Sequence, residues 1–173
     1  MEEEIEVPSE VDVEIKDSAV KVSGEKGEVH KELFHPLIKI SKKGDKIKIT
    51  SESKKKQMKA LIGTYKAHIE NMFMGVTEGF EYKLKAVFEH FPMSLESHPD
   101  KLVIKNFLGE KSPREAEILE GVEVDVDEQE ITVTGIDKEK TGQTAANIER
   151  TADPGNKKDR RIFSDGIYIV KKP

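Results

Sequence analysis

The chain contains an internal duplication, and this feature constrains its fold more than any other. Short matches recur in the same order at offsets of 84 to 87 positions. They pair Gly24-Glu25-Lys26 with Gly109-Glu110-Lys111, residues 47–50 with 131–134, Gln57, Ala60 and Ile62 with Gln143, Ala146 and Ile148, and Glu78-Gly79-Phe80 with Asp165-Gly166-Ile167. The period exceeds the roughly 20 to 50 residues of solenoid repeats. It therefore predicts two copies of one small domain, residues 1–86 and 87–173, with a boundary near Val87.

The spacing of apolar residues predicts both strands and helices in each copy. Apolar residues between Met58 and Phe73 recur at intervals of three and four, which indicates a helix over 53–74, capped by Ser51 or Ser53 and ended by Gly75. A second helix is expected at 138–150, and a short one within 110–120. Alternating residues predict strands at 11–15, 20–22, 37–40, 46–50, 81–88, 93–97, 102–106, 121–126, 130–134 and 167–170. The expected fold class is α+β, with two duplicated small domains, each a mostly antiparallel sheet with one main helix packed on one face.

The charges are segregated along the chain, although the net charge is only −5. Residues 1–14 hold seven acids, and residues 115–130 hold eight, with no Lys or Arg in either stretch. Residues 42–59 hold eight lysines against two acids, and residues 150–173 hold seven Lys or Arg against three Asp. Such blocks are either solvated faces or local fields that attract a partner of opposite charge.

Several classes of function lack support in the sequence. With no cysteine, disulfides, thiol catalysis and Cys-ligated zinc are excluded. The five His residues stand in no metal-ligand or catalytic spacing, and neither glycine-rich phosphate motif is present. We therefore expect no enzyme, no cofactor and no metal. With no long apolar run and no secretory leader, we also expect no membrane partner and a cytoplasmic location.

The two basic blocks suit contacts with phosphate, because cations at loops and helix ends position a nucleic-acid backbone. Phe163 and Tyr168 stand beside the second block and could stack on bases, although packing in the core is the more frequent use of such residues. Asp165-Gly166 has its counterpart in Glu78-Gly79, so we interpret it as a turn into the last strand. Charge alone leaves RNA binding and a solvated face equally open.

Two stretches of the second half resemble a known family. They are Gln143-Thr-Ala-Ala-Asn-Ile-Glu-Arg150 and Asn156-Lys-Lys-Asp-Arg-Arg-Ile-Phe-Ser-Asp-Gly-Ile-Tyr-Ile-Val-Lys171. Together they are similar to the C-terminal signature of the ribosomal large-subunit protein six family, in its archaeal or eukaryotic form, where the protein is also called number nine. Asn71-Met-Phe-Met-Gly-Val-Thr-Glu-Gly-Phe80 resembles the end of that family's first-domain helix. Bacterial members carry Tyr-Lys-Gly-Lys-Gly where this chain has 157–161, which favours an archaeal source.

The resemblance implies a structural protein of the large ribosomal subunit, in which the second domain binds ribosomal RNA near the sarcin–ricin loop. That position lies close to the stalk base and its proteins, where translational GTPases dock. The positions expected to bind RNA are Lys140, Gln143, Asn147, Arg150, Lys157, Lys158, Arg160, Arg161, Lys171 and Lys172. Their expected role is to neutralise phosphates, with little reading of bases. The acidic N-terminus is expected to face solvent or a basic protein.

Two other hypotheses remain open at this point. One is a protein–protein adaptor outside the ribosome, which would use its acidic strands and would have no RNA partner. The other is an enzyme with a histidine site, for which the sequence offers no motif. Sedimentation with the large ribosomal subunit separates the adaptor from a ribosomal protein.

Overall fold

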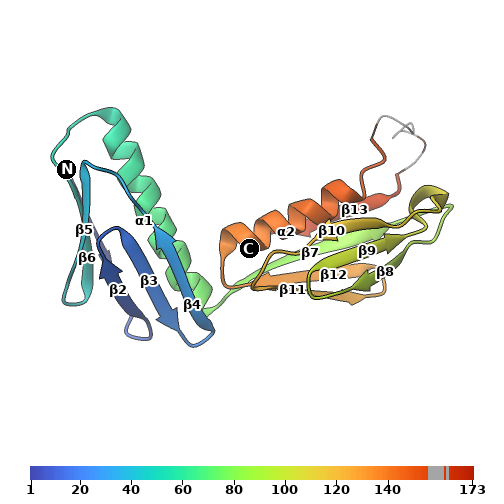
Figure 1. The fold of residues 1–173 in the computed structure, drawn as a ribbon, viewed down its shortest axis with the longest axis horizontal. Helices are drawn as coiled ribbons and strands as arrows, with labels where there is room; N and C mark the ends of the chain where they lie inside the picture. Colours follow the sequence, from blue (N-terminus) through green and yellow to red (C-terminus); the bar gives the residue numbers. More distant parts are fainter. Residues whose placement is uncertain (156–161, 163) are drawn as a thin grey trace. The chain divides into compact units, whose positions relative to one another are not determined.

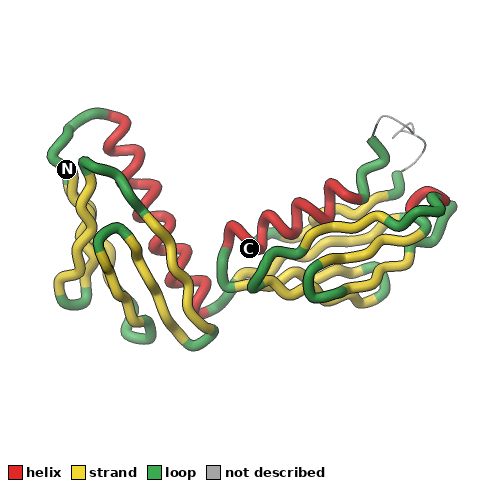
Figure 2. The backbone as a smooth tube through the Cα atoms, viewed as in Figure 1, coloured by secondary structure: helices red, strands yellow, loops and turns green. Residues whose placement is uncertain are grey.

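The computed structural model describes residues 1–155, 162 and 164–173, which form two compact units, Met1–Gly79 and Phe80–Pro173. Figures 1 and 2 show that each unit has one long helix and several strands. Every strand pair in the described residues is antiparallel. The predicted α+β class with two duplicated domains is thus confirmed, with the strands of each unit divided between two sheets.

The first unit contains six strands and a helix that packs against both of its sheets. One sheet has the order β1-β6-β5 and the other has the order β2-β3-β4. The elements are β1 (Glu2–Glu6), β2 (Asp12–Lys16), β3 (Ala19–Gly24), β4 (Gly27–Glu32), β5 (Ile38–Lys43), β6 (Lys46–Ser51) and α1 (Lys56–Thr77). The buried face of α1 includes Ile62 and Ile69, which are 2% and 0% exposed.

The second unit repeats this order and adds one strand. Its sheets have the orders β11-β12-β7-β13 and β10-β9-β8. The elements are β7 (Phe80–Val87), β8 (Ser94–Ser97), β9 (Lys101–Lys105), the 3-10 turn η1 (Phe107–Gly109), β10 (Arg114–Glu117), β11 (Val122–Asp127), β12 (Glu130–Gly135), α2 (Lys138–Thr151) and β13 (Gly166–Lys171). The core lies between α2 and both sheets, and its fully buried members include Leu84, Ile131 and Ile148.

The strand pairings make the duplication visible in three dimensions. In the first unit, Ile5 of β1 faces Ile47 of β6, and in the second unit Leu84 of β7 faces Ile131 of β12. The sheet β1-β6-β5 therefore corresponds to β7-β12-β11, and α1 corresponds to α2. The added strand, β13, pairs with the edge of β7 that faces away from β12 (Figure 1).

The boundary between the units lies at Gly79, not near Val87 as expected. The reason is the pairing of β7, which joins β12 on one side and β13 on the other. Both partners belong to the second unit, so the strand that directly follows α1 is the first strand of the second domain.

Several local predictions need correction. The stretch 110–120 contains the strand β10 instead of a short helix, because Ala116 is buried where β10 pairs with β9. The strands β1 and β4 were not predicted. Helix α1 has Lys55 at its N-cap without a side-chain cap, and it continues past Gly75 to Thr77.

Asp165-Gly166, which was predicted to be a turn, instead stands at the start of the strand, because Gly166 is the first residue of β13, while Glu78-Gly79 stands directly before β7. The two glycines serve different purposes. Gly79 has φ of 78°, a left-handed conformation that favours glycine. A Cβ on Gly166 would lie 3.0 Å from the Tyr168 ring and 3.2 Å from the main-chain oxygen of Ala152, so this position needs a small residue for lack of space.

Candidate nucleic-acid interface

Helix α2 is firmly fixed at its N-terminal end. The carboxylate of Asp137 accepts hydrogen bonds from the main-chain nitrogens of Glu139 at 2.8 Å and Lys140 at 3.3 Å, which caps the helix. The hydroxyl of Thr141, which is fully buried, donates to the main-chain oxygen of Asp137 at 2.6 Å. This end of α2 therefore has a defined position relative to the sheet.

Four of the predicted RNA-binding residues lie on one face of α2. Lys140, Gln143, Asn147 and Arg150 follow one another at intervals of three, four and three residues, which places them in one row along the helix. All are exposed except Asn147, which is half-buried. The opposite side of α2 carries Thr144, Ala145 and Ile148, which are all fully buried.

Hydrogen bonds hold the middle of this row in place. The amide of Gln143 donates to the side-chain oxygen of Asn147 at 2.8 Å, and the amide of Asn147 donates to the main-chain oxygen of Glu117 at 3.3 Å. The ammonium of Lys140 lies 3.5 Å from the main-chain oxygen of Glu120. The row thus presents two oriented amides between two cations, Lys140 and Arg150. Such groups can donate to phosphate and ribose oxygens.

The C-terminal end of α2 is held by Arg114, a residue that the sequence did not single out. One guanidinium nitrogen donates to the main-chain oxygens of Thr151 and Asp153, at 2.8 Å each. The other two nitrogens donate to the two carboxylate oxygens of Glu110, at 2.8 and 2.7 Å. Arg114 thereby occupies the carbonyl of Thr151, which the end of the helix leaves without a partner, and that of Asp153 in the following segment.

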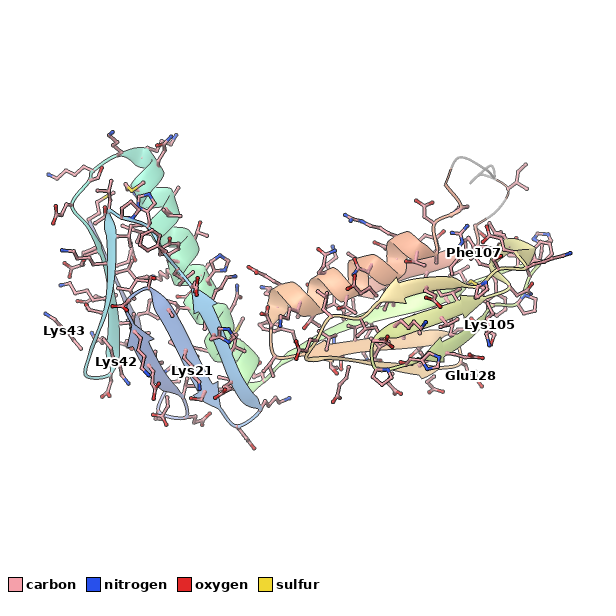
Figure 3. All side chains as sticks on the ribbon, viewed as in Figure 1. Lys21, Lys42, Lys43, Lys105, Phe107 and Glu128 are labelled. Carbon is pink, nitrogen blue, oxygen red and sulfur yellow. The ribbon has the colours of Figure 1, made fainter. Side chains whose placement is uncertain are left out.

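The ring of Phe107 packs against the guanidinium group of Arg114, which together with its hydrogen bonds forms a clamp on the end of α2. The guanidinium carbon of Arg114 lies 4.2 Å from the ring centroid, and Phe107 is 1% exposed. Figure 3 labels Phe107 at the end of the second unit where α2 terminates. A spacing of four residues, as between Glu110 and Arg114, indicates an ion pair only on a helix. These two residues do not share a helix, so their contact had no usable signal in the sequence.

The tail lysines lie at the other end of the unit. Lys171 is opposite Lys83 near the start of β7, and its ammonium is 3.7 Å from the carboxylate of Glu81. The start of β7 pairs with the end of β12, from which the chain enters α2. The exposed Lys171 and Lys172 are therefore near the N-terminal end of α2, while Arg150 lies in its last turn.

The remaining predicted positions, Lys157, Lys158, Arg160 and Arg161, lie outside the described residues, as does Phe163. Tyr168 is 44% exposed, and its hydroxyl donates to the main-chain oxygen of Ser164 at 2.9 Å. Asp165 is fully buried, and neither of its carboxylate oxygens has a hydrogen-bond partner among the described residues.

The basic block of the first unit is partly neutralised by the acidic N-terminus. The carboxylate of Glu2 binds Lys48, and this hydrogen bond raises the pKa of Lys48. Lys46 lies 3.7 Å from Glu4 and 3.6 Å from Glu6. Figure 3 shows Lys42 and Lys43 near the turn between β5 and β6, and Lys42 donates to the main-chain oxygen of Val13 at 3.0 Å. Part of this block therefore stabilises the first unit itself.

The described residues show no other arrangement that suggests chemistry. In the part of the chain that the structure describes, no three His, Asp or Glu side chains are grouped as metal ligands would be. Neither α1 nor α2 has the length and apolar character needed to cross a membrane.

Comparison with known proteins identifies the family. The family model described as Ribosomal protein L6 matches residues 7–79 and 92–166, one stretch in each unit. A protein of Methanothrix thermoacetophila named large ribosomal subunit protein uL6 is 48% identical over 97% of this chain and 95% of its own length. Proteins of the same name from Haloarcula marismortui and Methanococcus vannielii are 45% and 48% identical, each over 98% of this chain and over 95% and 93% of their own lengths. The chain therefore belongs to the ribosomal protein L6 family.

Proposed function

We propose that the protein is a structural constituent of the cytoplasmic large ribosomal subunit and binds ribosomal RNA through its second unit. The family is structural and non-enzymatic. The observation that carries the RNA-binding role is the row Lys140, Gln143, Asn147 and Arg150 on α2, which is held at both ends by Asp137 and Arg114. A row of donors on a fixed helix suits a backbone of regularly spaced phosphates.

In this proposal the two ends of the row bind phosphate by charge. Lys140 and Arg150 neutralise phosphates, and Arg150 can do so with two parallel hydrogen bonds. The amides of Gln143 and Asn147 donate to ribose or phosphate oxygens between them. The cations at 157–161 follow α2 in the sequence and bind further phosphates, and Lys171 and Lys172 reach RNA beyond the N-terminal end of α2. Contacts of this kind position the protein with little reading of the base sequence.

The position we propose within the subunit is near the sarcin–ricin loop and the stalk base, with other ribosomal proteins as neighbours. The cationic segment 157–161, adjacent in sequence to the C-terminal end of α2, supports it, because a compact RNA loop offers closely spaced phosphates to such a cluster. A protein fixed there would support the region where translational GTPases dock.

Sedimentation tests the first part of this proposal. A tagged chain expressed in cells should travel with the large subunit through a high-salt gradient. If it remains in the supernatant, the protein is not a ribosomal constituent, and the adaptor hypothesis takes its place.

A photoreactive residue at position 150 then tests the location: we expect cross-links to the sarcin–ricin region, and cross-links confined to distant RNA would refute that location.

A further inference from the structure

The strand β1 has one edge without a partner in the described residues. It pairs only with β6, and the order β1-β6-β5 leaves it at the border of its sheet. The main-chain groups of Met1 and Ser51 exchange two hydrogen bonds, of 2.7 and 2.9 Å. The main-chain nitrogen of Val7 donates to the main-chain oxygen of Asp45 at 2.8 Å. Because such pairs alternate along an antiparallel ladder, the main-chain groups of Glu2, Glu4 and Glu6 point away from β6, toward the open edge.

The duplicated unit shows what this kind of edge accommodates. The strand β7 corresponds to β1, with Leu84 in the place of Ile5. The main-chain nitrogen of Ala86 donates to Gln129 at 2.7 Å, so the alternation turns the groups of Lys83 and Lys85 away from β12. There they meet β13, in which Tyr168 lies opposite Lys85. The same architecture thus carries a fourth strand where the first unit has none among the described residues.

The side of the helix next to this edge also differs between the units. In the second unit, the carboxylate of Glu149 on α2 accepts a hydrogen bond from the main-chain nitrogen of Ile169 in β13, at 3.0 Å. Ile62 and Ile148 correspond in the repeat, so Gly63 stands where α2 has Glu149. Gly63 is exposed, and a Cβ built on it would meet nothing within 4 Å. The first unit therefore has open space on the helix where the second unit grips its added strand.

We propose that the open edge of β1 is a docking site for an extended, basic segment of another protein, which adds to the sheet as a fourth strand. Main-chain hydrogen bonds to Glu2, Glu4 and Glu6 would hold it, in the manner of other strand-addition complexes. The three carboxylates lie on one face of β1, so every second residue of the incoming segment would be Lys or Arg.

The negative charge of this edge favours a basic protein segment over a second copy of the chain and over RNA. A second copy of the chain would bring its own glutamates against these, and like charges on neighbouring strands repel. RNA would bring phosphates to the same carboxylates. Lys46 and Lys48 contact these acids from β6, yet the side chains of Glu2 and Glu4 remain 48% and 49% exposed, and that of Glu6 remains 85% exposed. Their free oxygens can accept from cations on the opposite side.

One substitution separates main-chain pairing from simple attraction of charge. Glu4→Pro removes a main-chain N–H that faces the open edge, so the ladder to β6 keeps its hydrogen bonds, and proline is tolerated on edge strands. Glu4→Ala removes the carboxylate and keeps the N–H. An unchanged thermal melting curve for both variants confirms that the first unit is still folded.

The binding test uses the full chain and a synthetic peptide of alternating Lys and Val. Amide hydrogen exchange at Glu2, Glu4 and Glu6 is followed by NMR at millimolar peptide. We expect exchange to slow at least tenfold at these three positions and to stay slowed in Glu4→Ala. In Glu4→Pro, which has no amide at position 4, exchange at Glu2 and Glu6 should return to the peptide-free rate. A peptide of alternating Glu and Val should have no effect. Unchanged exchange with the Lys peptide, or equal slowing with the Glu peptide, would overturn the proposal.

The class of the natural partner is tested in the ribosome, and this second test rests on the proposed function. A photoreactive residue at position 6 should cross-link to a Lys- or Arg-rich protein segment in purified large subunits, and the cross-link should disappear in Glu4→Pro. A cross-link to rRNA, or none, overturns the inference while the chain still sediments with the subunit. If the chain does not sediment with it, the proposed function fails, and the peptide test alone decides the inference.

Discussion

Arg114 donates a hydrogen bond of 2.8 Å to the main-chain oxygen of Thr151, and this bond ties β10 to the last turn of α2. The same guanidinium binds Glu110 through two nitrogens and covers the ring of Phe107. The end of α2 from which the cationic segment continues is therefore fixed by a residue that is not part of the proposed RNA contact. Stability and RNA binding can be tested separately on this basis.

Removal of this clamp should destabilise the second unit. Arg114→Ala leaves the carbonyls of Thr151 and Asp153 without their donor, and we expect a loss of about 2 kcal/mol in the free energy of unfolding. Urea unfolding followed by circular dichroism measures it. Arg114→Lys keeps the charge without the planar fork, so it should recover only part of the loss. Equal stability of Arg114→Ala and the wild type would show that the clamp contributes nothing.

The two helix N-termini should respond differently to alanine. Asp137→Ala removes the side-chain cap of α2 and should cost about 1 kcal/mol. Lys55→Ala at the corresponding position of α1 removes no cap hydrogen bond, so the melting temperature should stay nearly constant. The pair is compared by thermal unfolding, and a larger loss for Lys55→Ala would contradict this account of the caps.

Two glycines of the first unit should give opposite results. A Cβ on Gly24 would lie 2.8 Å from Cγ2 of Val76 and 2.9 Å from its main-chain oxygen, so Gly24→Ala should destabilise by about 1 to 3 kcal/mol. Gly63 is exposed within α1 and has open space around it, so Gly63→Ala should stabilise by about 1 kcal/mol. Chemical denaturation of both variants decides the matter, and destabilisation by Gly63→Ala would mean that the space is not open.

The sequence predicted the elements whose residues carry their own pattern. The apolar spacing of α1 and the alternation of β11 and β12 are local signals, and these elements formed with their ends shifted by at most three residues from the expected ones. The strand β1 has only Ile5 as an inward apolar residue, so no alternation reveals it. Residues 114–117 consist of good helix formers, yet pairing with β9 makes them a strand. In both cases a distant partner decides the structure.

The candidate site likewise combines features that local sequence determines with features that depend on distant residues. Helical spacing could place Lys140, Gln143, Asn147 and Arg150 on one face, because that relation is local. Nothing in the sequence indicated that Arg114 closes the end of α2, since its partners Thr151 and Asp153 are 37 and 39 positions away. The separation of Lys171 from Arg150 likewise depends on the register between β13 and β7.

The salt dependence of rRNA binding tests the central claim most directly. The slope of log affinity against log salt should fall by about 0.7 to 0.9 for each phosphate that the protein no longer neutralises. Arg160→Ala combined with Arg161→Ala should therefore lower the slope by roughly one to two units on an RNA fragment containing the sarcin–ricin loop. The control is Lys105→Ala, which removes an ammonium already held by Glu96 at 2.6 Å and should leave the slope unchanged. If the double variant keeps the wild-type slope, those arginines do not bind RNA phosphates, and the part of the proposed interface that follows α2 in the sequence is contradicted.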